Sequence, residues 1–239
     1  IFGLHSIVKH GSAQQKRDWL PKVISGELRA CFGVTEPDAG LDTTKLGTRA
    51  VRQGDEYVVH GRKIWISTAQ VADKMLLLAR TTPLADVAKP TQGLSLFYTD
   101  LDRAKVEVRE IEKMGRKAVD SNMLFIDGLR IPAEDRIGEE GKGFIYLMSE
   151  LPQERLSIAV SAQASAQKAY DDTVAFVKDR KAFGKTVFDF QNTRFVLADL
   201  KTKLQVGWAH LDWALNRHAK KELTAVEGAA AKLWHTELQ

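Results

Sequence analysis

The stretch CFGVTEPDAGLD, residues 31–42, joins an apolar run directly to a group of turn-forming residues. Its first four residues, Cys31–Val34, have the character of a short strand. Pro37 fixes φ and Gly40 permits a positive φ, so the residues that follow predict a tight turn. A purely structural turn would explain this composition. The alternative is that the hydroxyl and the acids within it shape the rim of a ligand site.

The composition is that of a soluble globular protein rather than a disordered, fibrous or membrane-spanning one. The 239 residues are 44% hydrophobic and 28% charged, and no run approaches the roughly 20 apolar residues of a membrane helix. The net charge of +4 is carried by interspersed charges, as in residues 178–181, which favours a solvated surface over a nucleic-acid-binding patch. The sequence opens without Met at Ile1 and stops within a helical pattern at Gln239, so we expect a fragment.

Neither the cysteine nor the histidines indicate a reactive or metal-binding site. Cys31 is the single cysteine, and its apolar surroundings predict a small core residue rather than a nucleophile. His210 and His218 lie eight residues apart, too far for one chelate on a helix, and no other pair has metal-ligand spacing. We therefore expect no metal site.

Hydrophobic periodicity divides the chain into three predicted domains: a helical remnant at residues 1–28, a β-rich region at 29–137 and a helical region at 138–239. In the first region, a Ser-x-x-Gln capping box at Ser12 predicts a helix that ends before Pro21. The middle region predicts a sandwich or barrel of short strands. The predicted strands are Tyr57–His60, Ile64–Ser67, Met75–Ala79, Leu94–Tyr98, Val106–Ile111 and Met123–Ile126, with turns at Gln53–Asp55, His60–Gly61 and Asp127–Gly128.

The last region predicts long antiparallel helices joined by short links, which is typical of a helical bundle. One helix begins at Pro152 and runs to about Arg180, and a second spans about Asp189–Lys220. A third begins at Thr224, which forms a capping box with Glu227. The predicted buried stripes are Leu156, Val160, Gln163, Ala166, Tyr170, Val174 and Val177 on the first helix, and Val196, Leu200, Leu204, Gly207, Leu211 and Leu215 on the second.

Three further segments carry residues suited to chemistry. Trp65 and Ser67 share one face of a predicted strand, where the tryptophan is either a core residue or an aromatic wall for a flat heteroaromatic cofactor. Glu154 falls in the first turn of the long helix, where an acid either pairs with the helix dipole or acts as a general base. The basic link at residues 179–185, followed by Gln191, is either a solvated loop or an anion clamp.

The order and spacing of these segments resemble the acyl-CoA dehydrogenase family of flavoproteins along essentially the whole chain. The first region contributes to the resemblance at Gly11–Lys16 and Leu20–Glu27. The resemblance implies an α+β fold: an N-terminal helical domain, mostly absent here, a middle β-barrel or sandwich domain, and an incomplete C-terminal four-helix bundle. The sequence Pro-Gln-Glu-Arg-Leu at residues 152–156 resembles the long-chain and isovaleryl-type branch, in which the catalytic base lies at the position of Glu154.

The resemblance also implies individual roles. Glu154 would abstract the Cα proton of an acyl-CoA thioester while FAD N5 accepts the Cβ hydride, and Arg155 would meet the CoA moiety. The usual family turn reads TEPGAGSD; here Asp38 replaces the first glycine, and Leu41 replaces a serine that faces the substrate, which leaves the acyl preference open. The implied cofactor contacts are Phe32, Val34 and Thr35 along the isoalloxazine, Trp65 and Ser67 as its aromatic wall and hydroxyl, and Arg180, Phe183 and Gln191 reaching the FAD of a neighbouring subunit.

The implied function is FAD-dependent α,β-desaturation of an acyl-CoA in fatty acid β-oxidation, with electrons passed to an electron-transferring flavoprotein. The implied assembly is a homotetramer or homodimer without nucleic acid or a membrane span, in the cytoplasm of a bacterium or the mitochondrial matrix of a eukaryote. One alternative is a flavin oxidase or monooxygenase on the same fold. Another is a family member that binds nucleic acid or a partner protein without turnover.

Overall fold

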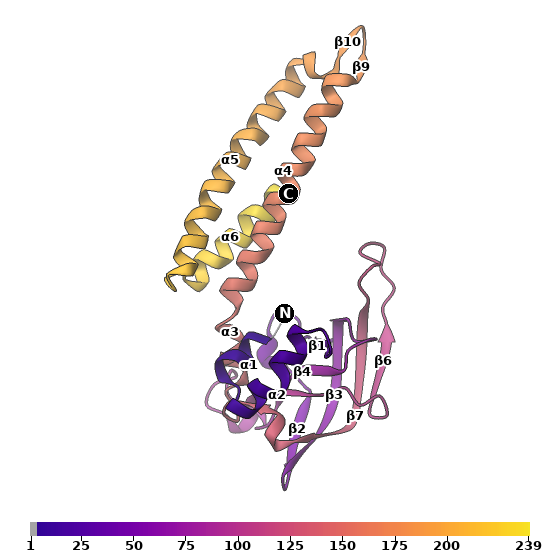
Figure 1. Ribbon diagram of the computed structural model, residues 1–239, viewed down its shortest axis with the longest axis vertical. Coiled ribbons are helices and arrows are strands. Elements are labelled where there is room, and N and C mark those ends of the chain that lie inside the picture. Colours follow the sequence, from indigo (N-terminus) through magenta and orange to yellow (C-terminus); the bar gives the residue numbers. More distant parts are fainter. Residues whose placement is uncertain (1–3) are drawn as a thin grey trace. The chain divides into compact units, whose positions relative to one another are not determined.

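A computed structural model describes residues 4–239, and the chain divides into two compact units, Ile1–Ser149 and Glu150–Gln239 (Figure 1). The first unit is built mainly of strands and the second mainly of helices. This arrangement confirms the predicted α+β fold with a β-rich middle region followed by a helical bundle. Within residues 4–239, no helix combines the length and apolar character needed to cross a membrane. The first three residues of the predicted helical remnant, residues 1–3, lie outside the described part of the chain.

Two helices, α1 (Leu4–His10) and α2 (Ala13–Ile24), open the described part of the first unit. The predicted capping box is confirmed, because the Ser12 hydroxyl accepts from the Gln15 amide and the Gln15 side chain accepts from the Ser12 amide. The prediction that this helix ends before Pro21 is wrong. Proline removes only its own N–H, and the last turn still forms, with an amide four residues on donating to the Pro21 carbonyl at 2.9 Å.

One eight-stranded sheet forms the framework of the described part of the first unit. Its main path runs β6-β7-β3-β2-β4-β5-β8, and β1 pairs in parallel with β4 off this path. The short helix α3 (Gly143–Met148) follows the sheet. The strands are β1 (Ala30–Gly33), β2 (Arg49–Gln53), β3 (Glu56–Ser67), β4 (Lys74–Arg80), β5 (Leu94–Asp100), β6 (Val106–Glu110), β7 (Ser121–Pro132) and β8 (Arg136–Ile137).

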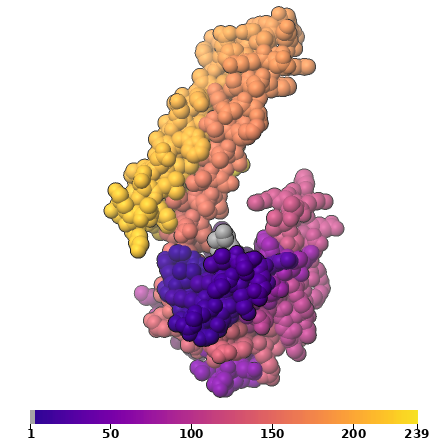
Figure 2. All heavy atoms as spheres, viewed as in Figure 1, coloured from indigo at the N-terminus to yellow at the C-terminus, as the bar shows by residue number. Residues whose placement is uncertain are grey.

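The sheet carries a hydrophobic core on each face. All seven residues of β4 are buried. Because alternate side chains of a strand point to opposite faces, Met75 and Leu77 join one core cluster while Leu76 and Leu78 join the other. Apolar residues of α1 and α2 pack against the second cluster, and Figure 2 shows these helices, in indigo, on the outside of this unit. Burial on both faces explains why β4 reads as a nearly continuous apolar run.

Strands β3 and β7 are longer than predicted, because two of the predicted turns are positions inside strands. β3 continues through His60–Gly61, and β7 continues through Asp127–Gly128. The pairing register shifts opposite Gly128, whose φ is +70°, so this glycine is the extra residue of a β-bulge. The predicted turn at Gln53–Asp55 is confirmed, but β2, which precedes it, is missing from the predicted strands.

The second unit consists of three long helices and one short hairpin. The helices are α4 (Leu151–Asp179), α5 (Gln191–Ala219) and α6 (Ala225–Leu238), and the hairpin of β9 (Lys181–Ala182) and β10 (Lys185–Thr186) joins α4 to α5. These bounds agree closely with the predicted helices. The capping box of Thr224 and Glu227 at the start of α6 is also confirmed.

The predicted buried stripe of α4 is buried or half-buried throughout, but that of α5 is partly wrong. Val196 and Leu215 are 49% and 43% exposed, and Leu197 and Ala214 are buried in their place. An α-helix has 3.6 residues per turn, so residues spaced always four apart move gradually around the helix. Residues spaced alternately three and four apart stay on one face. The ends of the predicted stripe therefore rotate away from the core.

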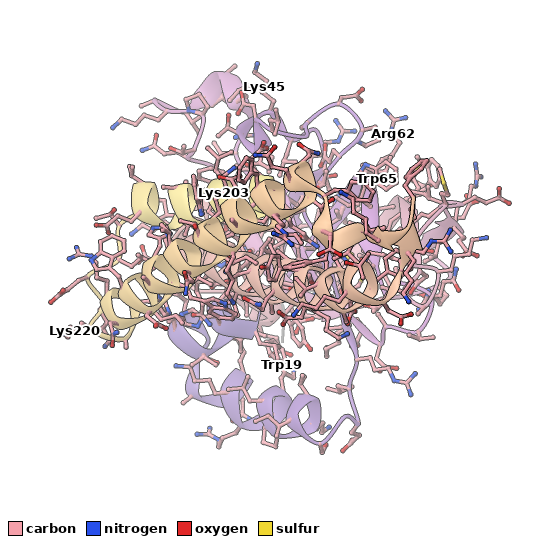
Figure 3. The ribbon with its side chains drawn as sticks, turned by 90° about the horizontal axis from the view of Figure 1, so that it is seen from above. Trp19, Lys45, Arg62, Trp65, Lys203 and Lys220 are labelled. Carbon is pink, nitrogen blue, oxygen red and sulfur yellow. The ribbon has the colours of Figure 1, made fainter. Side chains whose placement is uncertain are left out.

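Charged side chains are spread over the surface in pairs of opposite sign, as the sequence predicts. Lys45, Arg62 and Lys203, labelled in Figure 3, pair with nearby aspartates at 3.4, 3.2 and 2.7 Å. Exposed pairs of this kind contribute little to stability, roughly 0 to 1 kcal/mol each.

A chain of hydrogen-bonded polar side chains crosses the core of the second unit. Gln163 Nε2 donates to the Leu204 carbonyl at 2.8 Å, and its Oε1 lies 2.9 Å from His235 Nδ1. His235 Nε2 lies 3.3 Å from His210 Nδ1. Since the amide oxygen can only accept, His235 donates through Nδ1 and accepts from His210 through Nε2. The close approach of α4 and α5 here requires Gly207, where an added Cβ would lie 2.4 Å from Gln163 Oε1.

We expect the second unit to lose stability as the pH falls below the ordinary histidine pKa of 6.5. Burial, and then the charge of His210, lower the pKa of His235. Below pH 6.5 the unfolded chain therefore binds more protons than the native state, and acid favours unfolding. Thermal unfolding from about pH 8 to about pH 5 checks this, and His235→Gln should flatten the dependence. His218→Gln, which removes an imidazole outside the hydrogen-bonded chain, should behave as wild type. An unchanged pH dependence in His235→Gln would contradict the expectation.

Candidate functional site

The turn at residues 34–40 is held from inside by a buried acid. Glu36 is only 6% exposed, and its carboxylate accepts hydrogen bonds from Gly47 N at 2.7 Å and Thr48 N at 3.0 Å. The backbone closes the turn where Ala39 N donates to the Glu36 carbonyl at 3.2 Å. One of the acids that the sequence places in this turn is therefore a structural anchor that faces the protein.

Lys63 on β3 is the counter-ion of Glu36 and is completely buried. Its Nζ donates to Glu36 Oε1 at 2.9 Å, to the Val34 carbonyl at 3.0 Å and to the Leu78 carbonyl at 2.8 Å, which satisfies all three of its N–H groups. Burial lowers the pKa of Lys63 to about 8, against the raising effect of Glu36. Burial raises the pKa of Glu36, but the charge of Lys63 and the hydrogen bonds outweigh it and lower that pKa overall. The pair joins the turn to β3 and β4.

A bulge in β3 turns Trp65 away from the core. Lys63 pairs with Leu124 and Ile66 with Asn122, so three steps on β3 match two steps on β7. Trp65 has a φ of +62°, which is rare for a large side chain. Regular alternation would put Trp65 on the buried face of Lys63, but the bulge buries Ile66 and leaves Trp65 58% exposed. The interpretation of Trp65 as a core residue is therefore excluded.

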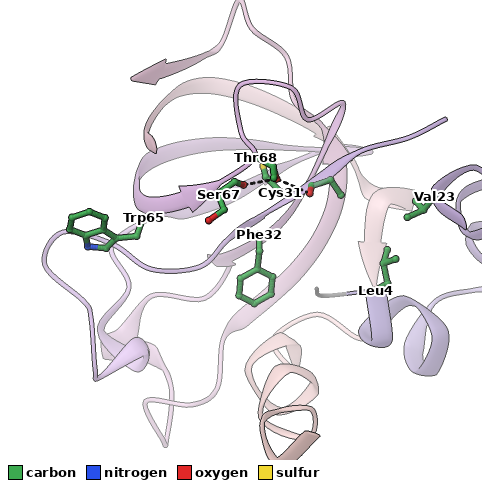
Figure 4. A pocket seen from close by; sticks show the side chains of 8 residues that line it. Leu4, Val23, Cys31, Phe32, Trp65, Ser67 and Thr68 are labelled. Atoms are coloured by element: carbon green, nitrogen blue, oxygen red, sulfur yellow. Dashed lines mark hydrogen bonds between the residues drawn. The ribbon is translucent and has the colours of Figure 1, made fainter. Parts of the chain in front are cut away.

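Trp65 lies at one end of a cavity of about 390 Å³ in the first unit. Figure 4 shows Trp65 and Leu4 at opposite ends of the lining, with Phe32 and Ser67 between them. Thr68, which has a φ of +62°, adds a second hydroxyl that donates to the Ser67 carbonyl at 2.6 Å. The lining is mostly apolar and contains two hydroxyls; it consists of Leu4, Val23, Ala30, Cys31, Phe32, Trp65, Ser67 and Thr68.

This lining fits a flat heteroaromatic cofactor with polar atoms on its rings. Phe32 and the exposed indole of Trp65 offer apolar surface, and Ser67 offers a hydroxyl that can donate and accept. The wall is also tied together, because Ile64 N donates to the Thr35 carbonyl at 2.9 Å and thereby links β3 to the turn. An isoalloxazine is a flat ring system with polar nitrogens and carbonyls, so the residues present are compatible with a flavin.

The structure brings together three of the five cofactor residues predicted in the first unit. Phe32, Trp65 and Ser67 line the cavity, whereas Val34 and Thr35 do not. Val34 is 8% exposed and packs in the core, and Thr35 uses its carbonyl in the link to β3. The cofactor contacts of all five residues stay predictions.

Five lining residues are missing from the predicted site, namely Leu4, Val23, Ala30, Cys31 and Thr68, and two of them carry a polar side-chain group. Thr68 directly follows Ser67, and its hydroxyl is the signal that sequence reasoning could have used. Cys31 has a predicted core role, which is confirmed, since it is 4% exposed and packs in a core cluster. Burial raises the pKa of the Cys31 thiol to about 12, so the thiol stays protonated near neutral pH.

Asp38 and Leu41, the two departures from the usual family turn, both lie at the surface. Asp38 pairs with Arg62 on β3 at 3.2 Å, and both side chains are exposed. Leu41 is fully exposed. Its side chain therefore takes no part in the core. The predicted substrate contact of Leu41 stays a prediction.

Glu154 lies in the first turn of α4, as predicted, with Arg155 beside it. Burial raises the pKa of Glu154. Glu227 occupies the first turn of α6, but there the backbone amide and hydroxyl of Thr224 lower the carboxyl pKa. Two acids at similar helix positions therefore have pKa values shifted in opposite directions. The difference follows from the hydrogen bonds of Thr224 at Glu227 and from burial at Glu154, and a raised pKa suits a proton acceptor.

The three residues predicted to meet a neighbouring subunit surround the β9–β10 hairpin of the second unit. Arg180 caps the end of α4, and Gln191 begins α5. Phe183, at the turn, is 95% exposed with a φ of +54°, and its ring lies edge-on to Phe190 with centroids 6.3 Å apart. An exposed aromatic side chain on a short hairpin is suited to contact with another molecule. The contacts of these residues with FAD stay predictions.

Two family models match this chain. Residues 31–129 match the middle domain of acyl-CoA dehydrogenases, and residues 141–239 match their C-terminal domain. The mitochondrial long-chain specific acyl-CoA dehydrogenase of Sus scrofa is 37% identical over 245 aligned positions, which cover 100% of this chain and 56% of the relative. The caffeyl-CoA reductase–Etf complex subunit CarC of Acetobacterium woodii is 34% identical, covering 95% of this chain and 59% of that protein.

Solved structures show the same likeness. The crystal structure of an acyl-CoA dehydrogenase from Geobacillus kaustophilus superposes with a TM-score of 0.93 at 38% identity, covering 99% of this chain and 63% of that one. The chain therefore belongs to the acyl-CoA dehydrogenase family, whose members are FAD-dependent flavoproteins. It spans 56% of the length of its long-chain specific relative.

Proposed function

We propose that the full-length protein is an FAD-dependent acyl-CoA dehydrogenase that introduces an α,β double bond into an acyl-CoA thioester. The supporting observation is the cavity of the first unit, where Phe32, Trp65 and Ser67 meet on a wall anchored by the Lys63–Glu36 pair. Phe32, Trp65 and Ser67 would hold the ring system of the cofactor. Bound FAD supplies the hydride acceptor that the reaction needs.

Glu154 is the proposed base that removes the Cα proton. Its raised pKa supports this role, because a carboxylate with a higher pKa accepts a proton more readily near neutral pH. Arg155, the next residue, is proposed to meet the CoA moiety. The long-chain name of the Sus scrofa relative supports a place in the long-chain branch of the family.

An electron-transferring flavoprotein is the proposed electron acceptor, and the name of the Acetobacterium woodii relative as a subunit of a reductase–Etf complex supports it. Arg180, Phe183 and Gln191 are proposed to reach the FAD of a neighbouring subunit, in a homotetramer or homodimer. The mitochondrial names of several relatives support a matrix location if the protein is eukaryotic, whereas a bacterial protein would act in the cytoplasm.

Titration of the purified full-length protein with acyl-CoAs of graded chain length tests this function. The visible absorbance of bound FAD should bleach on reduction by substrate, and the chain length that bleaches it most efficiently identifies the substrate class. Reduced protein should then stay reduced in air until an electron-transferring flavoprotein is added. Rapid reoxidation by oxygen would instead identify an oxidase or monooxygenase, and a colourless protein would contradict the flavin site.

Trp65→Asn is expected to weaken FAD binding without weakening the fold. Asparagine adopts a positive φ more readily than tryptophan, so the variant should relieve backbone strain of about 1 kcal/mol. Loss of the indole should cost about tenfold in the Kd for FAD, the value of one aromatic contact. Flavin fluorescence quenching by apo-protein measures the Kd, and thermal unfolding measures stability. Leu84→Asn, at an exposed position of the first unit outside the cavity, is the control. Equal FAD affinity in the two variants would contradict the role of Trp65.

A further inference from the structure

The carboxylate of Asp120, the residue just before β7, holds the segment that contains the cavity residues Ser67 and Thr68. Asp120 Oδ1 accepts from Thr68 N at 3.1 Å, and Asp120 Oδ2 accepts from Gln70 N at 3.3 Å. Asn122, two residues further on, donates from its side chain to the Ile66 carbonyl at 2.9 Å and to the Asp120 carboxylate. Residues 66–70 are thus bound to β7 by side chains after the regular strand pairing has ended at Ser67.

This support acts where the backbone is strained. Thr68 has a φ of +62°, and a β-branched residue in the left-handed region is a genuine outlier. Such a conformation is energetically unfavourable and persists only when its surroundings hold it. Thr68 lines the cavity, and Ser67 beside it supplies the other hydroxyl. Release of Thr68 would therefore move two of the polar residues that line the cavity.

The carboxylate is held in its charged form. Burial raises the pKa of Asp120, but the hydrogen bonds from Asn122 and from the amides of Gln70 and Thr68 outweigh this and lower it overall. Asp120 is therefore ionised at neutral pH, and it accepts from two backbone amides without donating a proton. Charge-assisted hydrogen bonds of this kind are stronger than those between neutral groups.

We propose that Asp120 is a positioning residue for the cofactor: by binding the amides of Thr68 and Gln70, it fixes the left-handed corner at Thr68 and thereby the positions of Ser67 and Thr68 in the cavity wall. This inference rests on the proposed flavin function of the same cavity. Asp120 is not among the residues that line the cavity, so its effect on the cofactor passes through the backbone.

Asp120→Ala in the full-length protein tests the inference, with the Kd for FAD and the visible spectrum of bound FAD as readouts. Loss of the carboxylate should raise the Kd about tenfold or more, the equivalent of one good hydrogen bond, and should shift the flavin absorbance band. Asp120→Asn keeps one acceptor oxygen for Thr68 N but turns an amide group toward Gln70 N, so its Kd should fall between those of wild type and Asp120→Ala. Asp127→Ala removes an exposed aspartate of β7 that pairs with His60 on β3, and this variant should bind FAD as wild type does.

The possible outcomes separate this inference from the function on which it rests. If wild type and Asp127→Ala bind FAD and Asp120→Ala binds it equally well with an unchanged spectrum, the inference is overturned and the proposed function stands. If Asp120→Ala does not fold, Asp120→Asn decides: wild-type FAD affinity and spectrum in that variant would also overturn the inference. A wild-type protein that binds no FAD would overturn both. A purely structural role would lower the unfolding temperature of the apo-protein without changing the flavin spectrum, and that result too would overturn the inference.

Discussion

Glu154→Gln in the full-length protein is expected to keep FAD bound and to lose desaturation activity by roughly 10²- to 10⁴-fold, the usual contribution of a general base. Glutamine has almost the same size as glutamate and can still form hydrogen bonds, but it cannot take up the Cα proton. Burial raises the pKa of Glu154, which indicates that the surroundings tolerate a neutral side chain. The rate of FAD bleaching after mixing with acyl-CoA measures the effect, and the absorbance of the resting protein reports the FAD content.

Glu227→Gln provides a matched control. Glu227 is also an acid in the first turn of a helix of the second unit, and glutamine can replace it in the capping box with Thr224. This variant should bleach at the wild-type rate. Near-normal turnover in Glu154→Gln would show that the base lies elsewhere in the protein, and loss of FAD from that variant would assign Glu154 a role in cofactor binding instead.

Glu36→Gln is expected to destabilise the first unit by about 3–5 kcal/mol, because it leaves the ammonium group of Lys63 buried without its counter-charge. Lys63 is completely buried, so water cannot replace the lost carboxylate. Equilibrium unfolding in urea measures the free energy. Glu56→Gln, which breaks an exposed pair with Arg130 at 2.8 Å, should change it by less than about 1 kcal/mol.

The pH dependence of the Glu36→Gln variant identifies the cause. Burial lowers the pKa of Lys63 to about 8 from 10.5, so between these values the unfolded chain binds more protons and stability rises with pH. Without Glu36 the pKa of Lys63 should fall further, and the variant should regain stability as the pH rises from neutrality. The double variant Glu36→Gln/Lys63→Met should cost less than the sum of the single variants. Additive effects, or a loss that does not depend on pH, would mean that Lys63 is not charged in the native protein.

Most of the helices and strands could be predicted because their signals are local. The capping boxes at Ser12 and Thr224 need only four consecutive residues, and both are confirmed. The predictions fail where the same short sequence is compatible with two local structures. Asp127–Gly128 suits a tight turn, but in the sheet Gly128 is a bulge, because β7 continues to pair with β3 on both sides of it. Pro21 similarly interrupts one hydrogen bond without ending its helix.

The candidate site could be predicted in part. Phe32, Trp65 and Ser67 come from segments whose unusual composition is visible in the sequence, and the structure places them around one cavity. The support behind them could not be predicted. Lys63 and Asp120 read as ordinary surface charges, and their partners lie 27 and 52 residues away in the chain. Only the folded sheet shows that Lys63 is buried and that Asp120 binds the segment that follows β3.

The sequence by itself determined the order of the strand-rich and helical regions, the helix starts and the family, because these depend on periodicity and on residues close together in the chain. Only the tertiary structure decided which way Trp65 faces. Its neighbours alternate with a period of two, and on that pattern Trp65 would share the buried face of Lys63. One extra residue in β3 reverses the alternation. With that bulge, Lys63 stays buried against Glu36 and pairing with β7 resumes at Ile66, while Trp65 adopts a left-handed backbone conformation.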